Sequence, residues 1–130
     1  MITLLSPAKS LDFNTKASTE NYSNPQFLHE SQKLIKICRN LSIQDISKLM
    51  NISENLANLN FERFFNWTLP FKLDNAKQAI YTFNGEVYSG LDANNFNEKE
   101  INYAQDHLRI LSGLYGILKP LDLIQAYRLE

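Results

Sequence analysis

The sequence predicts an α+β fold, with mostly helices around a small mixed sheet. Two sequence signatures mark the starts of helices, because Ser42 is followed by Asp45, and Asn97 by Glu100, at the spacing of a capping box. A short apolar run at residues 2–5 is typical of a buried strand. No internal repeat, linker or low-complexity segment divides the chain. We therefore expect residues 1–130 to be the N-terminal portion of a single larger domain.

After the strand at 2–5, the first half of the chain is predicted to be helical. Residues 11–24 are polar and rich in turn formers, and Pro25 follows Asn24 at a favourable first position for a helix over 26–40. Two further helices should begin after Ser42 and Ser53. The expected buried stripes of the three helices are Phe27, Ser31, Leu34, Ile35, Cys38 and Leu41; Ile43, Ile46 and Leu49; and Leu56, Leu59, Phe64 and Phe65.

The second half alternates apolar helical patterns with glycines. Residues 75–83 are predicted to be helical, with Ala76, Ala79 and Ile80 facing inward, and Gly85 interrupts that pattern. A longer helix is expected over 98–111, and its buried stripe would be Ile101, Ala104, Leu108 and Leu111. With the glycine-containing segment that follows, it would form a helix-hairpin-helix-like element near residues 98–124.

Composition places the chain among ordinary globular proteins. Of its 130 residues 44% are hydrophobic and 21% charged, and the net charge is −1, so no bulk positive field draws it to nucleic acid or to a membrane. Its single cysteine, Cys38, excludes an internal disulfide, which fits the cytoplasm. His29, His107 and Cys38 lack the spacing of metal ligands, so we expect no metal and no cofactor.

The segment Leu111-Ser112-Gly113-Leu114-Tyr115-Gly116 carries the sharpest local signal. A glycine turn between two helices can direct backbone N–H groups at a DNA phosphate, and Lys119 would add a positive charge. The segment resembles the hairpin of helix-hairpin-helix modules, although its glycines are one residue further apart and Pro120 replaces a continuing helix. A purely structural turn that packs Leu114, Tyr115 and Ile117 explains the pattern equally well.

Two other segments allow similar alternatives. Lys9 lies in the loop Ser6-Pro7-Ala8-Lys9 after the predicted strand, where a lysine can meet an anion at the edge of an open sheet or can simply be solvated. The segment 85–91 has glycines five residues apart around Tyr88. It indicates either a helix punctuated by glycine or a backbone that approaches a ligand closely.

Together these segments resemble the YaaA-type peroxide stress proteins. The blocks that carry the resemblance are 2–12, 85–91 and the run from His107 to Glu130 that ends in Tyr127-Arg128-Leu129-Glu130. The resemblance implies a cytoplasmic bacterial protein made under hydrogen peroxide stress that limits intracellular free iron and protects DNA. It also implies DNA binding, a mixed α/β fold with a helix-hairpin-helix element and a positively charged cleft. Family members are about twice as long and continue after the equivalent of Glu130.

Carried over by position, the resemblance implies a set of DNA- or phosphate-binding residues. Gly113 and Gly116 would form the hairpin turn, flanked by Ser112 and Tyr115, and the cleft charges would be Lys9, Arg109, Lys119 and Arg128. The expected partner is DNA, either duplex or distorted, with no membrane and no protein partner.

The alternative is an enzyme that acts on a nucleotide or a nucleic acid. Its cleft would be lined by the Ser6–Lys9 loop and the glycine-containing blocks, with Lys9, Tyr88, Tyr115 or Arg128 at the site. No nucleophile or acid–base signature singles out a catalytic residue, which favours a protein that is not an enzyme. Direct iron sequestration is disfavoured because oxygen ligands show no pattern and nitrogen and sulfur ligands are scarce.

Overall fold

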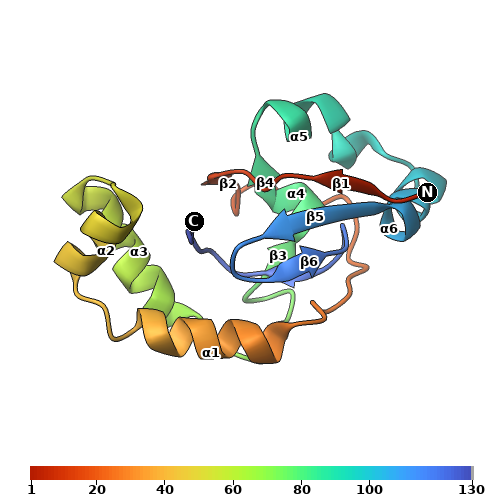
Figure 1. The fold of residues 1–130 in the computed structure, drawn as a ribbon. Coiled ribbons are helices and arrows are strands. Elements are labelled where there is room, and N and C mark those ends of the chain that lie inside the picture. Colours follow the sequence, from red (N-terminus) through yellow and green to blue (C-terminus); the bar gives the residue numbers. More distant parts are fainter. Residues whose placement is uncertain (130) are drawn as a thin grey trace.

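A three-stranded sheet joins the first residues of the chain to its last third. The computed structural model describes residues 1–129, in which β1 (Thr3–Leu5), β5 (Leu108–Ser112) and β6 (Gly116–Leu118) lie in the order β1-β5-β6 (Figure 1). The pairing of β1 with β5 is parallel and that of β5 with β6 is antiparallel, so the sheet is mixed, as predicted. The register sets Leu5 beside Ile110, and Ile110 beside Leu118.

Two short antiparallel pairs extend this framework. β2 (Ser10–Leu11) pairs with β4 (Phe83–Asn84), and β3 (Lys77–Gln78) pairs with β7 (Leu123–Ile124). The remaining elements are α1 (Leu28–Cys38), α2 (Ile43–Met50), α3 (Glu54–Asn66), α4 (Ala79–Thr82), α5 (Glu86–Leu91), the 3-10 turn η1 (Ala93–Asn95) and α6 (Glu98–His107). The α+β class predicted from the sequence is confirmed.

Helices α1, α2 and α3 form an arm that curves away from the sheet, with the C-terminal end of the chain inside the curve (Figure 1). The capping predictions are confirmed here. The Ser42 side chain accepts the backbone N–H of Asp45 at 3.1 Å, and Ser53 accepts that of Leu56 at 3.2 Å. Because such caps satisfy N–H groups that the helix leaves open, they fix where α2 and α3 begin.

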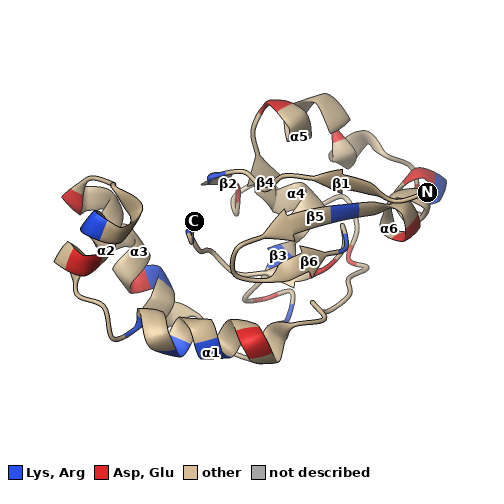
Figure 2. Ribbon diagram, viewed as in Figure 1, with Lys and Arg blue, Asp and Glu red and all other residues tan. Residues whose placement is uncertain are grey.

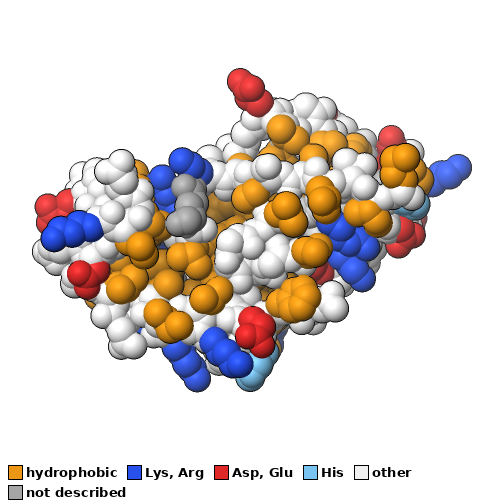
Figure 3. All heavy atoms as spheres, viewed as in Figure 1, with side chains coloured by type: hydrophobic (Ala, Val, Ile, Leu, Met, Phe, Trp, Pro, Cys, Tyr) orange, Lys and Arg blue, Asp and Glu red, His pale blue; other side chains and the backbone are white. Residues whose placement is uncertain are grey.

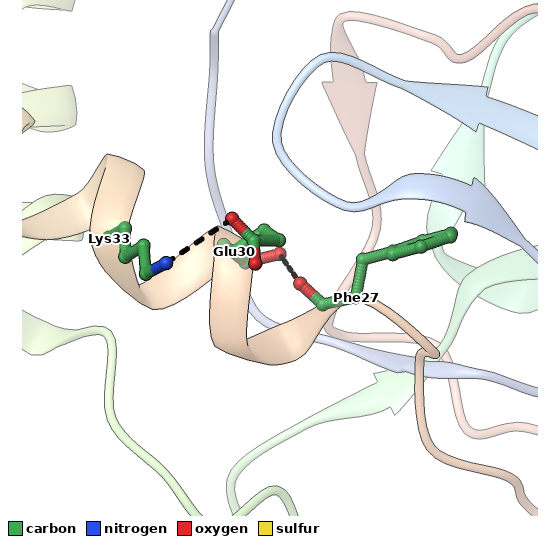
Figure 4. Close-up of polar contacts among 4 residues, drawn as sticks. Phe27, Glu30 and Lys33 are labelled. Carbon is green, nitrogen blue, oxygen red and sulfur yellow. Dashed lines mark hydrogen bonds and ion pairs between the residues drawn. The ribbon is translucent and has the colours of Figure 1, made fainter.

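Helix α1 is tied to the β5–β6 hairpin through a buried serine. The Ser31 hydroxyl lies within hydrogen-bonding distance of the Phe27 carbonyl at 3.1 Å and of the Leu114 carbonyl at 2.9 Å. Figure 4 shows the first of these contacts beside the ion pair of Glu30 and Lys33. The Lys33 Nζ lies 3.7 Å from a Glu30 carboxylate oxygen, and both side chains are exposed. Exposed pairs contribute little, so the contact with Leu114 is the one that positions the helix.

Helix α1 starts later than predicted. Its N-terminal cap is Phe27, which makes no side-chain capping bond, so Asn24 and Pro25 do not begin it. The Ser23 N–H donates to the Leu121 carbonyl at 2.9 Å, and the Ser23 carbonyl accepts from Leu123 at 3.0 Å. This long-range pairing holds the backbone in a β-bridge just before Pro25 and delays the helix.

The predicted helix at 75–83 is largely wrong, although its inward residues are correct. Only Ala79–Thr82 forms a helical turn, because Lys77 and Gln78 pair with β7. Backbone bonds from Ala79 to Asp122 and from Ile80 to Pro120 continue that attachment. Ala76, Ala79 and Ile80 are buried, as expected from the pattern.

The helix predicted over 98–111 ends at His107, and the helix-hairpin-helix-like element is not present in residues 98–124. Leu108 begins β5 because the chain there pairs with Thr3 of β1. The residues after it form a β-hairpin with β6 instead of a second helix. The predicted cap survives, since the Asn97 side chain accepts the Glu100 N–H at 2.8 Å.

The core lies between the sheet and the arm. Its fully buried large side chains include Ile35, Ile46, Phe64, Trp67, Ile110, Tyr115, Leu118, Leu123 and Ile124. Several side chains assigned to buried stripes are instead exposed, namely Phe27, Leu34, Leu49, Leu56, Leu59, Phe65 and Leu111. Strand β1 was also expected to be buried, but Thr3 and Leu4 are exposed. Among residues 1–129, no helix has the length and apolar character needed to cross a bilayer.

Candidate functional site

The glycine segment forms the tip of the β5–β6 hairpin. Residues 113–115 make the turn, and the Ser112 hydroxyl oxygen accepts the N–H of Tyr115 at 3.0 Å and lies 3.3 Å from the N–H of Leu114. Gly116 closes the turn with a φ of 74°. A left-handed residue after a three-residue loop is a common way to close a hairpin. The N–H groups of Leu114 and Tyr115 are therefore engaged within the protein.

Gly116→Ala should destabilise this hairpin. An alanine there would adopt a left-handed φ, and its Cβ would lie 3.2 Å from the Phe27 ring. We expect the free energy of unfolding to fall by about 1–2 kcal/mol, mainly from backbone strain. Chemical denaturation of the variant and the parent chain measures the difference. An asparagine at the same position tolerates positive φ better, so Gly116→Asn should lose less.

Tyr115 belongs to the core and not to a binding surface. Its hydroxyl accepts the Trp67 Nε1–H at 2.9 Å and the Gln125 N–H at 3.0 Å, and donates to the Gln125 carbonyl at 3.0 Å. The residue is 0% exposed, and burial raises the pKa of its phenol well above the usual value. In this position it cannot touch DNA, and it instead joins the hairpin to the loop after α3.

Gly113 permits a close backbone crossing. A Cβ at this position would lie 2.5 Å from the Leu129 carbonyl oxygen, a distance that real Cβ atoms do not reach. Tyr127 adds a second tie, since its hydroxyl lies 2.7 Å from the Ser112 hydroxyl. The segment 127–129 therefore runs directly over the hairpin tip.

A pocket of about 240 Å³ opens beside this crossing. It is lined by Pro7, Ala8, Lys9, Tyr127, Arg128 and Leu129. Because β1 and β5 are parallel, their carboxyl ends meet at one edge of the sheet, and the loop after β1 lies beside Ser112. This edge is where ligands bind in open α/β sheets.

The block at 85–91 packs against the loop that follows β1. The Tyr88 hydroxyl donates to the Ser6 carbonyl at 2.6 Å, and a Cβ on Gly85 would lie 3.6 Å from the Ala8 Cβ. Burial, together with the charge of Tyr127, raises the pKa of Tyr88 to about 12. Two of the three sequence blocks thus line the pocket, and the block at 85–91 contacts the loop that forms one of its walls. Glu130, the last residue of the third block, lies outside the described residues.

Positive charge gathers at the pocket. Lys9 and Arg128 line it, from segments 119 positions apart in the sequence. Figure 2 shows basic residues both before β2 and near the C-terminal end of the chain. The pKa of Arg63 on α3 is lowered, first by burial and then by the charge of Arg128, although Arg63 itself does not line this pocket. Sequence reasoning missed Arg63, because nothing in the α3 pattern links it to residues 127–129.

Two predicted cleft charges lie elsewhere. Arg109 pairs with Leu4 in the middle of the sheet, and its guanidinium donates to the carbonyls of Gln105 at 2.8 Å and Leu108 at 2.7 Å. It precedes Ser112 by three residues, which is about 10 Å along a strand. Lys119 follows β6 at the end away from the hairpin tip. The structure therefore brings together Lys9, Ser112, Gly113 and Arg128, and separates Arg109 and Lys119 from them.

The residues described offer no assembled metal centre. Within 1–129, no group of three or more His, Cys, Asp or Glu side chains is arranged to hold a metal ion. The Cys38 thiol is buried against the core, and burial raises its pKa. The polar side chains that line the pocket are those of Lys9, Tyr127 and Arg128, and this chemistry suits an anion.

Comparison with known proteins gives a consistent result. A family model described as "Peroxide stress protein YaaA" matches residues 1–130. Similar curated proteins include "UPF0246" proteins of Pseudoalteromonas translucida (54% identical), Shewanella amazonensis (52%) and Shewanella loihica (55%). Each match covers 100% of this chain and 50%, 51% and 50% of the relative, respectively. The chain thus spans about half the length of these relatives, and with the match along its whole length it belongs to the YaaA family of peroxide stress proteins.

Proposed function

We propose that the protein acts in the response to peroxide by limiting intracellular free iron and by binding and protecting DNA. The DNA contact is made through backbone phosphates at the pocket formed by residues 7–9 and 127–129. The observation that supports this site is that Lys9 and Arg128 line one pocket in a chain whose net charge is −1, with Arg63 within electrostatic reach of Arg128. Cations brought together by the fold form a local positive field that the composition as a whole lacks.

The pocket suits phosphate better than it suits bases. Lysine and arginine contacts to phosphate position a protein on DNA without reading its sequence. The hairpin tip is not the contact in this proposal, because Ser112 engages its N–H groups. Iron limitation is the part of the proposal that rests on the resemblance alone, and within residues 1–129 no group of three or more His, Cys, Asp or Glu side chains could hold iron.

Lys9→Ala is expected to weaken DNA binding and to reduce its dependence on salt. The loss of one phosphate contact should lower the slope of log K against log salt by about 1, with little change in fold because Lys9 is exposed. Lys119→Ala is the matched control, since it removes the same charge from a site outside the pocket. Titration of a labelled duplex, and of a duplex with an unpaired bubble, at two salt concentrations measures both variants. Equal weakening by Lys9→Ala and Lys119→Ala would contradict the assignment of the site.

A small nucleotide is the alternative ligand, favoured by the confined volume of the pocket. About 240 Å³ accommodates a phosphate-bearing small molecule but not a duplex, which could only lie across the opening. The serine and tyrosine hydroxyls of Ser112 and Tyr127 add polar groups near the wall. If nucleoside phosphates displace DNA, and Lys9→Ala abolishes that displacement, the pocket is a nucleotide site and turnover of the nucleotide should then be assayed.

A further inference from the structure

The outer face of the β1-β5-β6 sheet is apolar. Residues whose side chains share this face are Leu4, Leu111 and Ile117, one from each strand, since Leu111 pairs with Ile117 and Leu4 pairs with Arg109, two residues before Leu111. Their exposed fractions are 58%, 42% and 47%. We call these three residues the outer-sheet patch. Figure 3 shows hydrophobic side chains gathered over this part of the molecule and over the helical arm.

The charged residue on the same face does not interrupt the patch. Arg109 directs its guanidinium to the carbonyls at the end of α6, where the negative end of the helix favours a cation. The side chains on the opposite face, which include Ile110 and Leu118, are fully buried in the core. Both faces of this sheet are therefore apolar, although only one is covered.

The topology gives an independent reason to expect a covering layer. All-parallel sheets occur almost exclusively where both faces are packed, and their strands then lack the polar alternation of a solvated sheet. The β1–β5 pair is the parallel part of this sheet and has apolar side chains on both faces, but its outer face is exposed to solvent. An exposed antiparallel sheet would instead carry polar residues at the positions of Leu111 and Ile117.

We infer that the outer-sheet patch is an interface for the additional half of the polypeptide that the longer relatives carry. Those relatives match this chain over all 130 residues, which account for only about half of their length. Their remaining residues must bury apolar surface of their own, and a second layer over the sheet satisfies both surfaces at once. The occupant is thus a segment of the same polypeptide with a complementary apolar face.

Cysteine labelling in the full-length Pseudoalteromonas relative tests this inference. Single cysteines are placed at the positions aligned with Leu111 and Ile117, and in this chain as Leu111→Cys and Ile117→Cys with Cys38→Ser. The rate of maleimide labelling is then compared between the two proteins. We expect the rate to fall at least tenfold in the full-length protein. A cysteine aligned with Val87, which is 55% exposed on α5, is the control and should label at similar rates in both.

Three results would overturn the inference. One is equal labelling of the patch in the full-length protein and in this chain. Another is protection that disappears on dilution together with a dimer seen by sedimentation, which would assign the patch to a second copy. The third is protection of the Val87 position as strong as that of the patch, because a layer that covers the sheet specifically would leave α5 open to labelling. Thermal melting of each cysteine variant verifies that it is folded. If one of the two patch variants does not fold, the other still tests the inference.

Discussion

Gly113→Ala should displace the segment 127–129 and open the pocket. The new Cβ would lie 2.5 Å from the Leu129 carbonyl oxygen, so the backbone at one of these two places has to move. Because the obstacle is backbone and not a flexible side chain, rotamer changes cannot relieve it. We expect a loss of about 1–3 kcal/mol in the free energy of unfolding, the usual range for overpacking.

The same displacement should also weaken DNA binding. Arg128 and Tyr127 belong to the displaced segment and line the pocket with Lys9. We expect DNA affinity to fall at least tenfold in Gly113→Ala, at a temperature where the variant remains folded. Duplex titration measures the affinity, and urea denaturation measures the stability.

Gly90→Ala is the matched control for this substitution. A Cβ on Gly90 would meet no atom within 4 Å, and the residue lies in α5. Alanine there should stabilise the helix by up to about 1 kcal/mol and leave binding unchanged. If Gly113→Ala bound DNA as tightly as Gly90→Ala does, the crossing of 127–129 over the hairpin would have no part in binding.

Tyr115→Phe should be among the most destabilising conservative changes in the chain. It removes one hydroxyl but leaves the Trp67 indole N–H and the Gln125 backbone N–H buried without their acceptor. The Gln125 carbonyl also loses its donor. Each buried group left unsatisfied costs about 1–3 kcal/mol, so we expect a total loss of about 3 kcal/mol or more.

Urea denaturation followed by tryptophan fluorescence suits this test, because Trp67 is the single tryptophan and lies next to the change. Tyr103→Phe removes the same atom from a residue that is 66% exposed, and should change stability by less than about 0.5 kcal/mol. A Tyr115→Phe variant as stable as Tyr103→Phe would mean that water replaces the lost hydroxyl.

The sequence predicts the capped helix starts well because caps are local. Ser42 bonds to Asp45 and Asn97 bonds to Glu100, so both partners of each bond lie within four consecutive residues of the sequence. The α+β class is also confirmed. Lys9 and Arg128 lie in loops and line one pocket, and their role in binding stays a prediction.

The failures share a different cause. The helical pattern at 98–111 changes to a strand at Leu108 because a partner 105 residues earlier, Thr3, forms backbone bonds with it. The same reason applies to residues 77–78, which pair with β7. Local propensity depends only on neighbouring residues, so it does not include a partner that far away in the sequence. Tertiary pairing decides whether these residues form a helix or a strand. Arg63 was missed for an equivalent reason, since its link to Arg128 exists only in the folded chain.

The pairing of β1 with β5 also has a consequence for synthesis on the ribosome. Thr3 leaves the ribosome long before Leu108, its partner 105 positions later. At bacterial elongation rates of about 5–20 residues per second, β1 waits roughly 5–20 s for β5 to be made. Throughout that interval its apolar residues have no sheet to join. The sheet can therefore form only after translation has passed Ser112, when most of the 130 residues have already been made.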